Sequence, residues 1–376
     1  MSTGGHYLVL SGAMGNAGDF LIRERTLALL GELRPDRDLV LHDRWRSLDP
    51  ESPEVKDAAA IVLAGGPALQ RSMYPGIYPL SSPLAQLAAP IVPFGLGWKG
   101  RVASSSEVFR FRFDRSSREL LARIEADGLV GTSRDAPSVR VMQRAGLTRN
   151  VLGGCPAWYD MDAMGRPTPE LRTVEHLVVS TGVLPVRSPL FFEQQVDVLR
   201  SLAARYPNAQ RVAAFHHALS PEEQVSVEHG SALRLLAREA EQLGYEIVDV
   251  SGNAQGMESL YGRTDLHIGY RVHAHILRSS LRRPSVLLAE DARAYGAGEA
   301  LGSPWLTGVR LQRIAGRLRR FSGHRLGAVV PVANLSAQLS RLLDEQESSG
   351  WSYLRKLPEL QDRHLAVCRR AVESWP

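Results

Sequence analysis

The sequence predicts an α/β protein in which two Rossmann-like domains face each other across a cleft, followed by a C-terminal helical tail. Three observations lead to this fold class. The chain has 376 residues, too many for one ordinary core and a natural length for two domains. Short apolar runs alternate with amphipathic segments of helical period along the chain. Several apolar runs end in glycine, as the strands of doubly wound parallel sheets do.

The first domain is predicted to span residues 1–160. A glycine-containing turn at 15–19 separates its first strand from an amphipathic helix, and 128–147 combines a strand, a polar turn and a helix. Residues 150–160 close the domain. The other apolar runs that we expect to form strands are 7–12, 39–43, 58–69 and 90–100.

A second alternating series follows a polar segment with two prolines, which predicts a linker over 161–175. The second domain is predicted to span 176–333, and the helical tail 334–376. Helices are expected within the second domain at 191–206 and 229–244. The expected strands of this domain are 176–182, 211–217, 245–252, 265–270 and 285–291.

Composition favours a soluble cytoplasmic protein. The apolar fraction is 44% and the charged fraction 23%, and no apolar run approaches the roughly 18 residues of a membrane span. The N-terminus has no basic region ahead of its apolar run, so no secretory signal is expected. Two cysteines, Cys155 and Cys368, do not make a disulfide framework, which favours a reducing compartment.

The net charge of +5 is carried almost wholly by arginine, because Lys56, Lys99 and Lys356 are the only lysines. A guanidinium stays charged and presents a planar fork that suits carboxylate and phosphate groups. The arginines are spread along the chain rather than clustered. This distribution favours an anionic small substrate and does not favour nucleic acid.

Glycine turns at the ends of three N-terminal strands predict that a ligand approaches that sheet edge. The turn at 15–19 offers Asn16, Gly18 and Asp19, and the next offers Gly65 and Gly66. Glycine permits close approach of the backbone, and helix amides accept an anion. The glycine spacing is not that of the dinucleotide fingerprint. The alternative is that Asn16 and Asp19 only cap the helix.

Two further segments carry arginine. Arg134 follows a strand in SRD (133–135), where it either points into the cleft or lies on the surface. FRFRFDR (109–115) alternates aromatic and basic residues at strand period, with the phenylalanines on one face. Such alternation is typical of an amphipathic strand or loop, and also of a nucleic-acid or anionic-acceptor platform.

The strongest candidate site is RVHAHI (271–276), where a strand passes into a helix. Arg271 can hold a carboxylate or phosphate, and His273 can deliver a proton near neutral pH. His275 shares a face with one or both of them, depending on where the helix begins. The alternatives are a metal site formed by the two histidines, for which no third ligand is evident, and histidines that bond the backbone. His216, at the end of another strand, either faces the same cleft or lies in a surface loop.

Five segments occur in an order that resembles the polysaccharide pyruvyl transferase family. They are GNAGD (15–19), IVLAGGPAL (61–69), FGLGWKG (94–100), SRDAPS (133–138) and TDLHIGYRVHAHILRSSLRRPSVLLAEDARAYG (264–296). The resemblance covers roughly residues 10–300, and its Arg-x-His segment is the most specific part. The chain departs from the family in having Arg293 where a lysine is usual, GGCPA at 153–157, and His275 as an extra histidine.

The resemblance implies a fold similar to the two-lobed GT-B glycosyltransferases and transfer of a pyruvyl group from phosphoenolpyruvate to sugar hydroxyls, usually as a ketal. Phosphoenolpyruvate would bind the second domain and a sugar or glycan, free or lipid-linked, the first. Arg271 and His273 match the family's Arg-x-His, so Arg271 would grip phosphoenolpyruvate and His273 would be the general acid. Neither a cofactor nor a metal is implied. The substrate-binding candidates are Asn16, Gly18, Asp19, Gly65, Gly66, Arg134, His216, His275 and Arg293.

Two other functions remain open at the level of sequence. A GT-B glycosyltransferase would bind a nucleotide sugar in the second domain, with Glu290 or Asp291 on the ribose. A non-catalytic protein of the same fold would keep the lobes without the chemistry. The acceptor sugar and the oligomeric state are not defined by the sequence.

Overall fold

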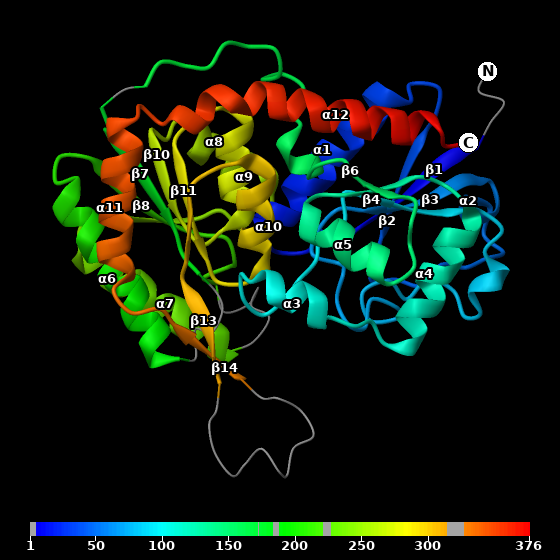
Figure 1. Ribbon diagram of the computed structural model, residues 1–376, viewed down its shortest axis with the longest axis horizontal. Coiled ribbons are helices and arrows are strands. Elements are labelled where there is room, and N and C mark those ends of the chain that lie inside the picture. Colours follow the sequence, from blue (N-terminus) through cyan, green and yellow to red (C-terminus); the bar gives the residue numbers. More distant parts are fainter. Residues whose placement is uncertain (1–4, 172, 183–187, 221–226, 314–326) are drawn as a thin grey trace, which may run out of the picture.

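The computed structural model describes residues 5–171, 173–182, 188–220, 227–313 and 327–376. Figure 1 shows two α/β lobes side by side, with the C-terminal helix α12 lying across both. The α/β class with parallel sheets is confirmed, as are the C-terminal helices. The boundaries drawn at residues 160 and 175 stay predictions. Parts of the predicted segments lie outside the described residues: 1–4, 172, 183–187, 221–226 and 314–326.

The N-terminal lobe is built on a parallel sheet of order β2-β1-β3-β4. A parallel bridge between Leu96 and Ser133 leads from the end of this sheet to the parallel pair β5-β6. Its strands are β1 (His6–Ser11), β2 (Leu39–Asp43), β3 (Ala58–Ala64), β4 (Ile91–Phe94), β5 (Gly131–Ser133) and β6 (Asn150–Leu152). Its helices are α1 (Ala17–Leu33), α2 (Pro53–Lys56), α3 (Ser105–Arg110), α4 (Arg115–Asp127) and α5 (Ala136–Arg144), with short 3-10 turns at Leu84–Gln86 and η2 (Pro156–Trp158).

The C-terminal lobe carries a six-stranded parallel sheet of order β12-β11-β10-β7-β8-β9, and β13 and β14 form an antiparallel pair. Its strands are β7 (His176–Ser180), β8 (Gln210–Phe215), β9 (Glu246–Asp249), β10 (Leu266–Gly269), β11 (Ser285–Ala289), β12 (Trp305–Thr307), β13 (Val309–Arg313) and β14 (Gly327–Pro331). Its helices are α6 (Pro189–Arg205), α7 (Val227–Gln242), α8 (Ala254–Gly262), α9 (Val272–Ser280) and α10 (Ala292–Leu301).

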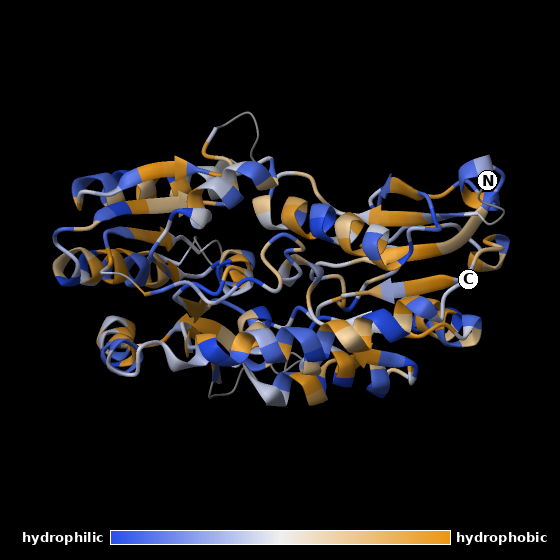
Figure 2. Cartoon of the chain, turned by 90° about the horizontal axis from the view of Figure 1, so that it is seen from above, coloured by the Kyte–Doolittle hydropathy of each residue, from blue (hydrophilic) through white to orange (hydrophobic). Residues whose placement is uncertain are grey.

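Both sheets are buried by helices, which explains why their strands read as continuous apolar runs. In Figure 2 the strands of both lobes are largely hydrophobic, whereas the helices show hydrophilic residues as well. The central strands β1, β3, β10 and β11 are almost wholly buried. Within the described ranges, no helix combines the length and the apolar character that a bilayer crossing requires.

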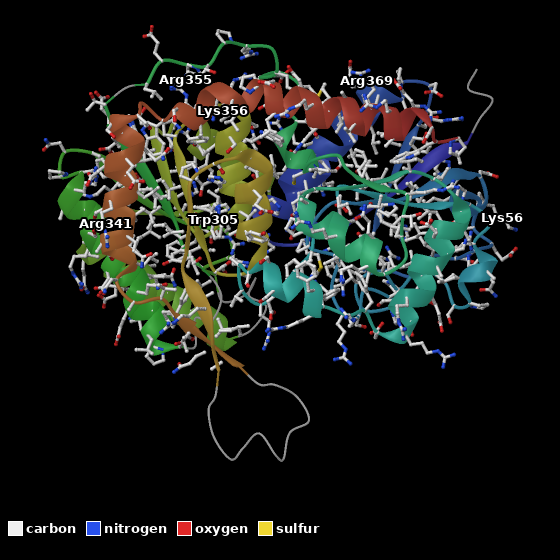
Figure 3. All side chains as sticks on the ribbon, in the orientation of Figure 1. Lys56, Trp305, Arg341, Arg355, Lys356 and Arg369 are labelled. Atoms are coloured by element: carbon white, nitrogen blue, oxygen red, sulfur yellow. The ribbon has the colours of Figure 1, made fainter. Side chains whose placement is uncertain are left out.

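The tail consists of α11 (Leu335–Ser348), a 3-10 turn at Ser352–Lys356 and α12 (Leu357–Glu373). Helix α11 packs on α6 of the C-terminal lobe, and α12 returns to the N-terminal lobe, where it contacts β6 and α1. The buried ring of Trp375 meets Tyr7 and Phe94 edge to face, and its indole donates to the Val130 carbonyl over 2.9 Å. Arg355, Lys356 and Arg369 lie along the outer margin of this tail (Figure 3).

Of the strand and the loop that the alternation at 109–115 left open, the strand is not observed, and the loop is observed for residues 111–114 between α3 and α4. The Ser104 hydroxyl caps α3, and Phe109 and Arg110 therefore belong to the last turn of that helix. Phe111 and Phe113 follow in a loop and stack edge to face with a centroid distance of 4.8 Å. Helix capping, rather than strand period, decides which phenylalanines point inward, and Phe109 stays exposed.

Direct polar contacts hold the two lobes together. Arg25 of α1 pairs with Glu258 of α8, in the other lobe, at 2.5 Å, and with Asp160 of its own lobe at 2.7 Å. The Gly252 amide donates to the Gly15 carbonyl over 2.9 Å. These contacts bring the N-terminus of α1 to the carboxyl end of the C-terminal sheet, which is the place where ligands bind in such folds.

Candidate active site

The N-termini of α1 and α9 meet between the lobes. Asn16 stands at the N-cap of α1, yet its side chain makes no capping hydrogen bond. Its Oδ1 instead accepts from Nη2 of Arg271 over 3.0 Å, and its Nδ2 donates to Asp19 over 3.2 Å. Asn16 therefore links the Gly-containing turn of the first lobe to the Arg-x-His segment of the second.

Arg271 occupies the N-cap of α9, directly after β10, and is 5% exposed. Its backbone amide donates to the Ser180 hydroxyl over 3.2 Å, which fixes the turn. Its Nη1 lies 3.6 Å from Oε1 of Glu290 but makes no hydrogen bond. Burial lowers the pKa of Arg271, and Glu290 opposes that effect. The guanidinium stays charged and has an N–H group free for a ligand.

His273 lies in the first turn of α9 and packs on α1 at Gly18, where a Cβ atom would collide with the imidazole. The side chain is buried, and its Nε2 has no hydrogen-bond partner. Burial, followed by the charges of Arg134, Arg293 and Arg271, holds the pKa of His273 well below its ordinary value. The imidazole is therefore neutral in the free protein and lies in a field of positive charge.

Arg134 reaches the same place from the N-terminal lobe, and the surface alternative is wrong because the residue is 3% exposed. It follows β5, and its side chain lies against Gly97, where a Cβ atom would collide with the guanidinium. Its Nε donates to Asp135 over 2.9 Å, and Asp135 in turn caps α5. Its Nη1 has no hydrogen-bond partner. Arg134 thus offers a second unused donor to a ligand.

The N-terminus of α10 supplies the remaining charged groups. Arg293 pairs with Asp291 at 2.7 Å and with Glu290 at 3.4 Å. Burial works against the charged form of Arg293, but Asp291 and Glu290 more than offset it, so the pKa of Arg293 is raised. Arg293 is thus a permanent cation, held where the resemblance places a lysine.

Sequence reasoning did not single out Lys99 as a site residue. The Gly100 carbonyl accepts from the Ala292 amide at the start of α10 over 3.4 Å, which holds Lys99 beside the charged groups of that helix. Desolvation and the nearby charge of Arg293 lower the pKa of Lys99. The signal in the sequence was its position directly after the third glycine turn, in a chain with few lysines.

His275 and His216 are placed in the core rather than in the cluster. Both ring nitrogens of His275 are engaged, Nδ1 with Ser285 and Nε2 with Ser303, each at 2.6 Å. Burial lowers the pKa of His275 to about 3. His216 bonds the Tyr261 hydroxyl over 2.7 Å, and its neighbour His217 is the one that approaches Arg271. Neither His275 nor His216 enters the function proposed below.

Gly65 and Gly66 both have positive φ, at 52° and 75°, and form the turn after β3. Gly65 lies against Ile22 of α1, and Gly66 beside Arg44. In the part of the chain that the structure describes, no three His, Cys, Asp or Glu residues are grouped so as to hold a metal ion.

A matched pair of glycines in α1 tests the packing of His273. We expect Gly18→Ala to destabilise the protein by about 1–3 kcal/mol, because its Cβ would have to displace the buried imidazole. Gly31→Ala lies in the same helix with nothing near its Cβ, and should stabilise by roughly 0.5–1 kcal/mol. Urea unfolding of both variants measures the difference. Equal effects of the two substitutions would show that α1 does not press on His273 at Gly18.

The fold and the site together define a two-lobed α/β protein with a cluster of buried cationic groups between its lobes. The family model for polysaccharide pyruvyl transferases matches residues 16–291, and the chain belongs to this family of transferases. No curated protein sequence matches the chain.

Solved structures share the fold at low sequence identity. S. aureus MnaA, in a co-structure with UDP, is 8% identical at a TM-score of 0.50, over 81% of this chain and 84% of that one. The UDP-GlcNAc 2-epimerase from Neisseria meningitidis, bound to UDP-GlcNAc, is 8% identical at a TM-score of 0.47, over 98% of each chain. The first likeness shows a shared fold alone.

Proposed function

We propose that the protein transfers the pyruvyl group of phosphoenolpyruvate to hydroxyls of a sugar or glycan and forms a ketal. Phosphoenolpyruvate carries a carboxylate and a phosphate, and the cluster between the lobes suits both. Arg271 binds the donor from the C-terminal lobe, Arg134 binds it from the N-terminal lobe, and His273 is the general acid.

One observation supports the proposal above the others: three buried side-chain nitrogen atoms from two lobes have no hydrogen-bond partner among the described residues. They are Nη1 of Arg271, Nη1 of Arg134 and Nε2 of His273. A buried polar group without a partner costs free energy, and a ligand that pairs with these three groups at one place would recover that cost. Because a carboxylate pairs with each of Arg134, Arg271 and Arg293, net charge does not favour an anion at this site. The unused N–H groups favour it.

The proposed reaction begins with proton transfer from His273. His273 donates a proton to the methylene carbon of phosphoenolpyruvate, and C2 becomes electrophilic. A sugar hydroxyl adds to C2 and returns its proton to His273. The C2–O bond to phosphate then breaks, a second hydroxyl closes the ketal, and its proton leaves with the phosphate. One hydroxyl proton thus ends on the new methyl group and the other on phosphate.

In the proposed reaction, Arg293 and Lys99 stabilise the departing phosphate. Both lie at the N-terminus of α10, beside Glu290 and Asp291. Fixed cations and helix amides oriented before the reaction lower the energy of a developing phosphate charge. Glu290 and Asp291 already accept from Arg293, an arrangement that does not favour their use on a ribose.

Thermal unfolding of the purified protein tests the donor. We expect phosphoenolpyruvate at about 100 times its dissociation constant to stabilise the folded state by roughly 2.7 kcal/mol. UDP and UDP-glucose serve as the comparison ligands, with pyruvate and inorganic phosphate as the separate halves of the donor. Stabilisation by the nucleotides alone would sink the proposal and favour glycosyl transfer.

A further inference from the structure

Arg44 is a buried arginine outside the cluster described above. It follows β2 and is 5% exposed. Its guanidinium crosses the end of β1 at Gly12, where a Cβ atom would collide with it, and Nη1 lies 3.2 Å from the Cβ position of Gly66 after β3. Arg44 therefore covers the carboxyl ends of two strands, at the sheet edge that the glycine turns leave open.

The charge of Arg44 has no counter-ion among the residues that the structure describes. No carboxylate among the described residues lies within ion-pair distance of it, and its Nε has no hydrogen-bond partner. The buried ring of Tyr78 has its centroid 5.8 Å from the guanidinium carbon. Taking an arginine out of water without an anion is costly, and among the described residues the rings of Trp45 and Tyr78 offset part of that cost. An anion from outside the chain would complete the arrangement.

The position of Arg44 connects it to the reaction centre. The Gly97 amide donates to the Gly66 carbonyl over 2.9 Å, and Gly97 packs against Arg134. The strands β1, β3 and β4 follow one another in the sheet, and Nη1 of Arg44 reaches Gly66 after β3, so roughly one to two strand spacings, ~5–10 Å, separate Arg44 from Gly97 beside Arg134. A sugar unit fits within that span.

Trp45 adds an apolar surface beside Arg44. Its ring lies 4.5 Å from the Arg44 guanidinium, and the residue is 38% exposed. An exposed indole presents a flat apolar face with a polar edge, which suits the C–H face of a pyranose ring. The neighbouring Arg46 is exposed as well. An aromatic face beside a buried cation favours a sugar that carries a negative charge.

We propose that Arg44 binds an anionic group of the acceptor, held bidentately by the guanidinium while Trp45 covers the sugar ring. The inference rests on the proposed function, because it takes the N-terminal sheet edge as the acceptor side. The anion is either the carboxylate of an acidic sugar or a phosphate on the sugar. A carboxylate presents two oxygens in one plane, and a phosphate presents two oxygens of a tetrahedral group. A guanidinium can donate to both oxygens of either anion.

Titration calorimetry with three probes of one ring type tests the site: glucuronic acid, glucose 1-phosphate and glucose. We expect wild-type protein to bind at least one acidic probe about tenfold or more tightly than glucose. The probe that shows the preference identifies carboxylate or phosphate as the ligand group. Arg44→Gln removes the charge, and Gly12→Ala keeps the charge but displaces the guanidinium. Both should reduce the preference to about twofold or less, whereas Arg341→Gln on α11 should keep it.

The same titrations with saturating phosphoenolpyruvate separate the two proposals. If the preference for an acidic probe over glucose persists with phosphoenolpyruvate bound, it belongs to Arg44. If that preference disappears, it belongs to the site of Arg271, and the inference is overturned. Equal affinity of wild-type protein for all three probes also overturns it, whether or not the variants fold. If phosphoenolpyruvate does not bind at all but the Arg44-dependent preference holds, the donor is wrong and the anion site stands.

Discussion

Replacing Arg271 by glutamine is expected to weaken the binding of phosphoenolpyruvate about 100-fold or more. The guanidinium is buried, charged and has one free N–H group, and glutamine provides neither the charge nor the fork. Arg271→Lys keeps a positive charge but cannot bind two oxygens in one plane, so we expect a loss of about tenfold. Titration calorimetry with phosphoenolpyruvate measures both losses. Arg341→Gln, on the outer face of α11 in Figure 3, is the control for charge alone.

A second variant decides whether Arg271 acts on the ligand or on the contact between lobes. Asn16→Ala removes the 3.0 Å hydrogen bond between the lobes and leaves the guanidinium in place. If Arg271 only docks the lobes, Asn16→Ala reproduces the loss caused by Arg271→Gln. If Arg271 contacts phosphoenolpyruvate, the affinity of Asn16→Ala falls only a fewfold. Retained tight binding in Arg271→Gln would exclude Arg271 from the donor site.

The parts of the fold that the sequence predicts are those set by local pattern. Apolar runs closed by glycine became the parallel strands, and the Arg-x-His segment stands at a strand-to-helix turn as expected. The alternation at 109–115 did not produce a strand: its first two residues end a helix that a serine caps, and residues 111–114 form a loop. Local hydrogen bonds at a helix end outweigh a short run of strand period.

Which of His273 and His275 faces the cleft depends on the residue at which α9 begins. Each residue turns an α-helix by about 100°, so the start of α9 decides which imidazole faces the cleft. The helix begins at Val272, which directs His273 to the other lobe and His275 into the core between Ser285 and Ser303. The pattern of the sequence does not fix this start, because Arg271 makes no side-chain cap.

The surroundings of Lys99, of Arg44 and of the donors without partners are set by the tertiary structure. Nothing near Lys99 in sequence shows that α10 will place Arg293 beside it, some two hundred residues later. A lone arginine after a strand is usually exposed, and only the folded sheet shows that Arg44 crosses Gly12 without a counter-ion. Pairing across the lobes cannot be predicted from spacing along the chain.

The binding of phosphoenolpyruvate is expected to take up a proton at His273. In the free protein, burial and the charges of Arg134, Arg293 and Arg271 keep the imidazole neutral by lowering its pKa. A bound dianion or trianion opposes those charges and raises the pKa, so affinity is greatest at low pH. Affinity should fall as pH rises through the pKa of the bound state, by up to about tenfold per pH unit for one proton.

His273→Gln should therefore bind phosphoenolpyruvate with a weaker dependence on pH, and its turnover should fall by about 100-fold to 10,000-fold because the methylene carbon receives no positioned proton. Calorimetry in buffers of different ionisation enthalpy counts the protons taken up by wild-type and variant protein. The difference between the two proteins separates proton uptake at His273 from the titration of phosphoenolpyruvate itself.

His275→Asn is the matched comparison, because the His275 ring bonds Ser285 and Ser303 in the core. We expect it to cost stability but to keep the proton uptake. Equal uptake by wild-type protein and His273→Gln would exclude His273 as the group that gains the proton, and with it the assignment of the general acid.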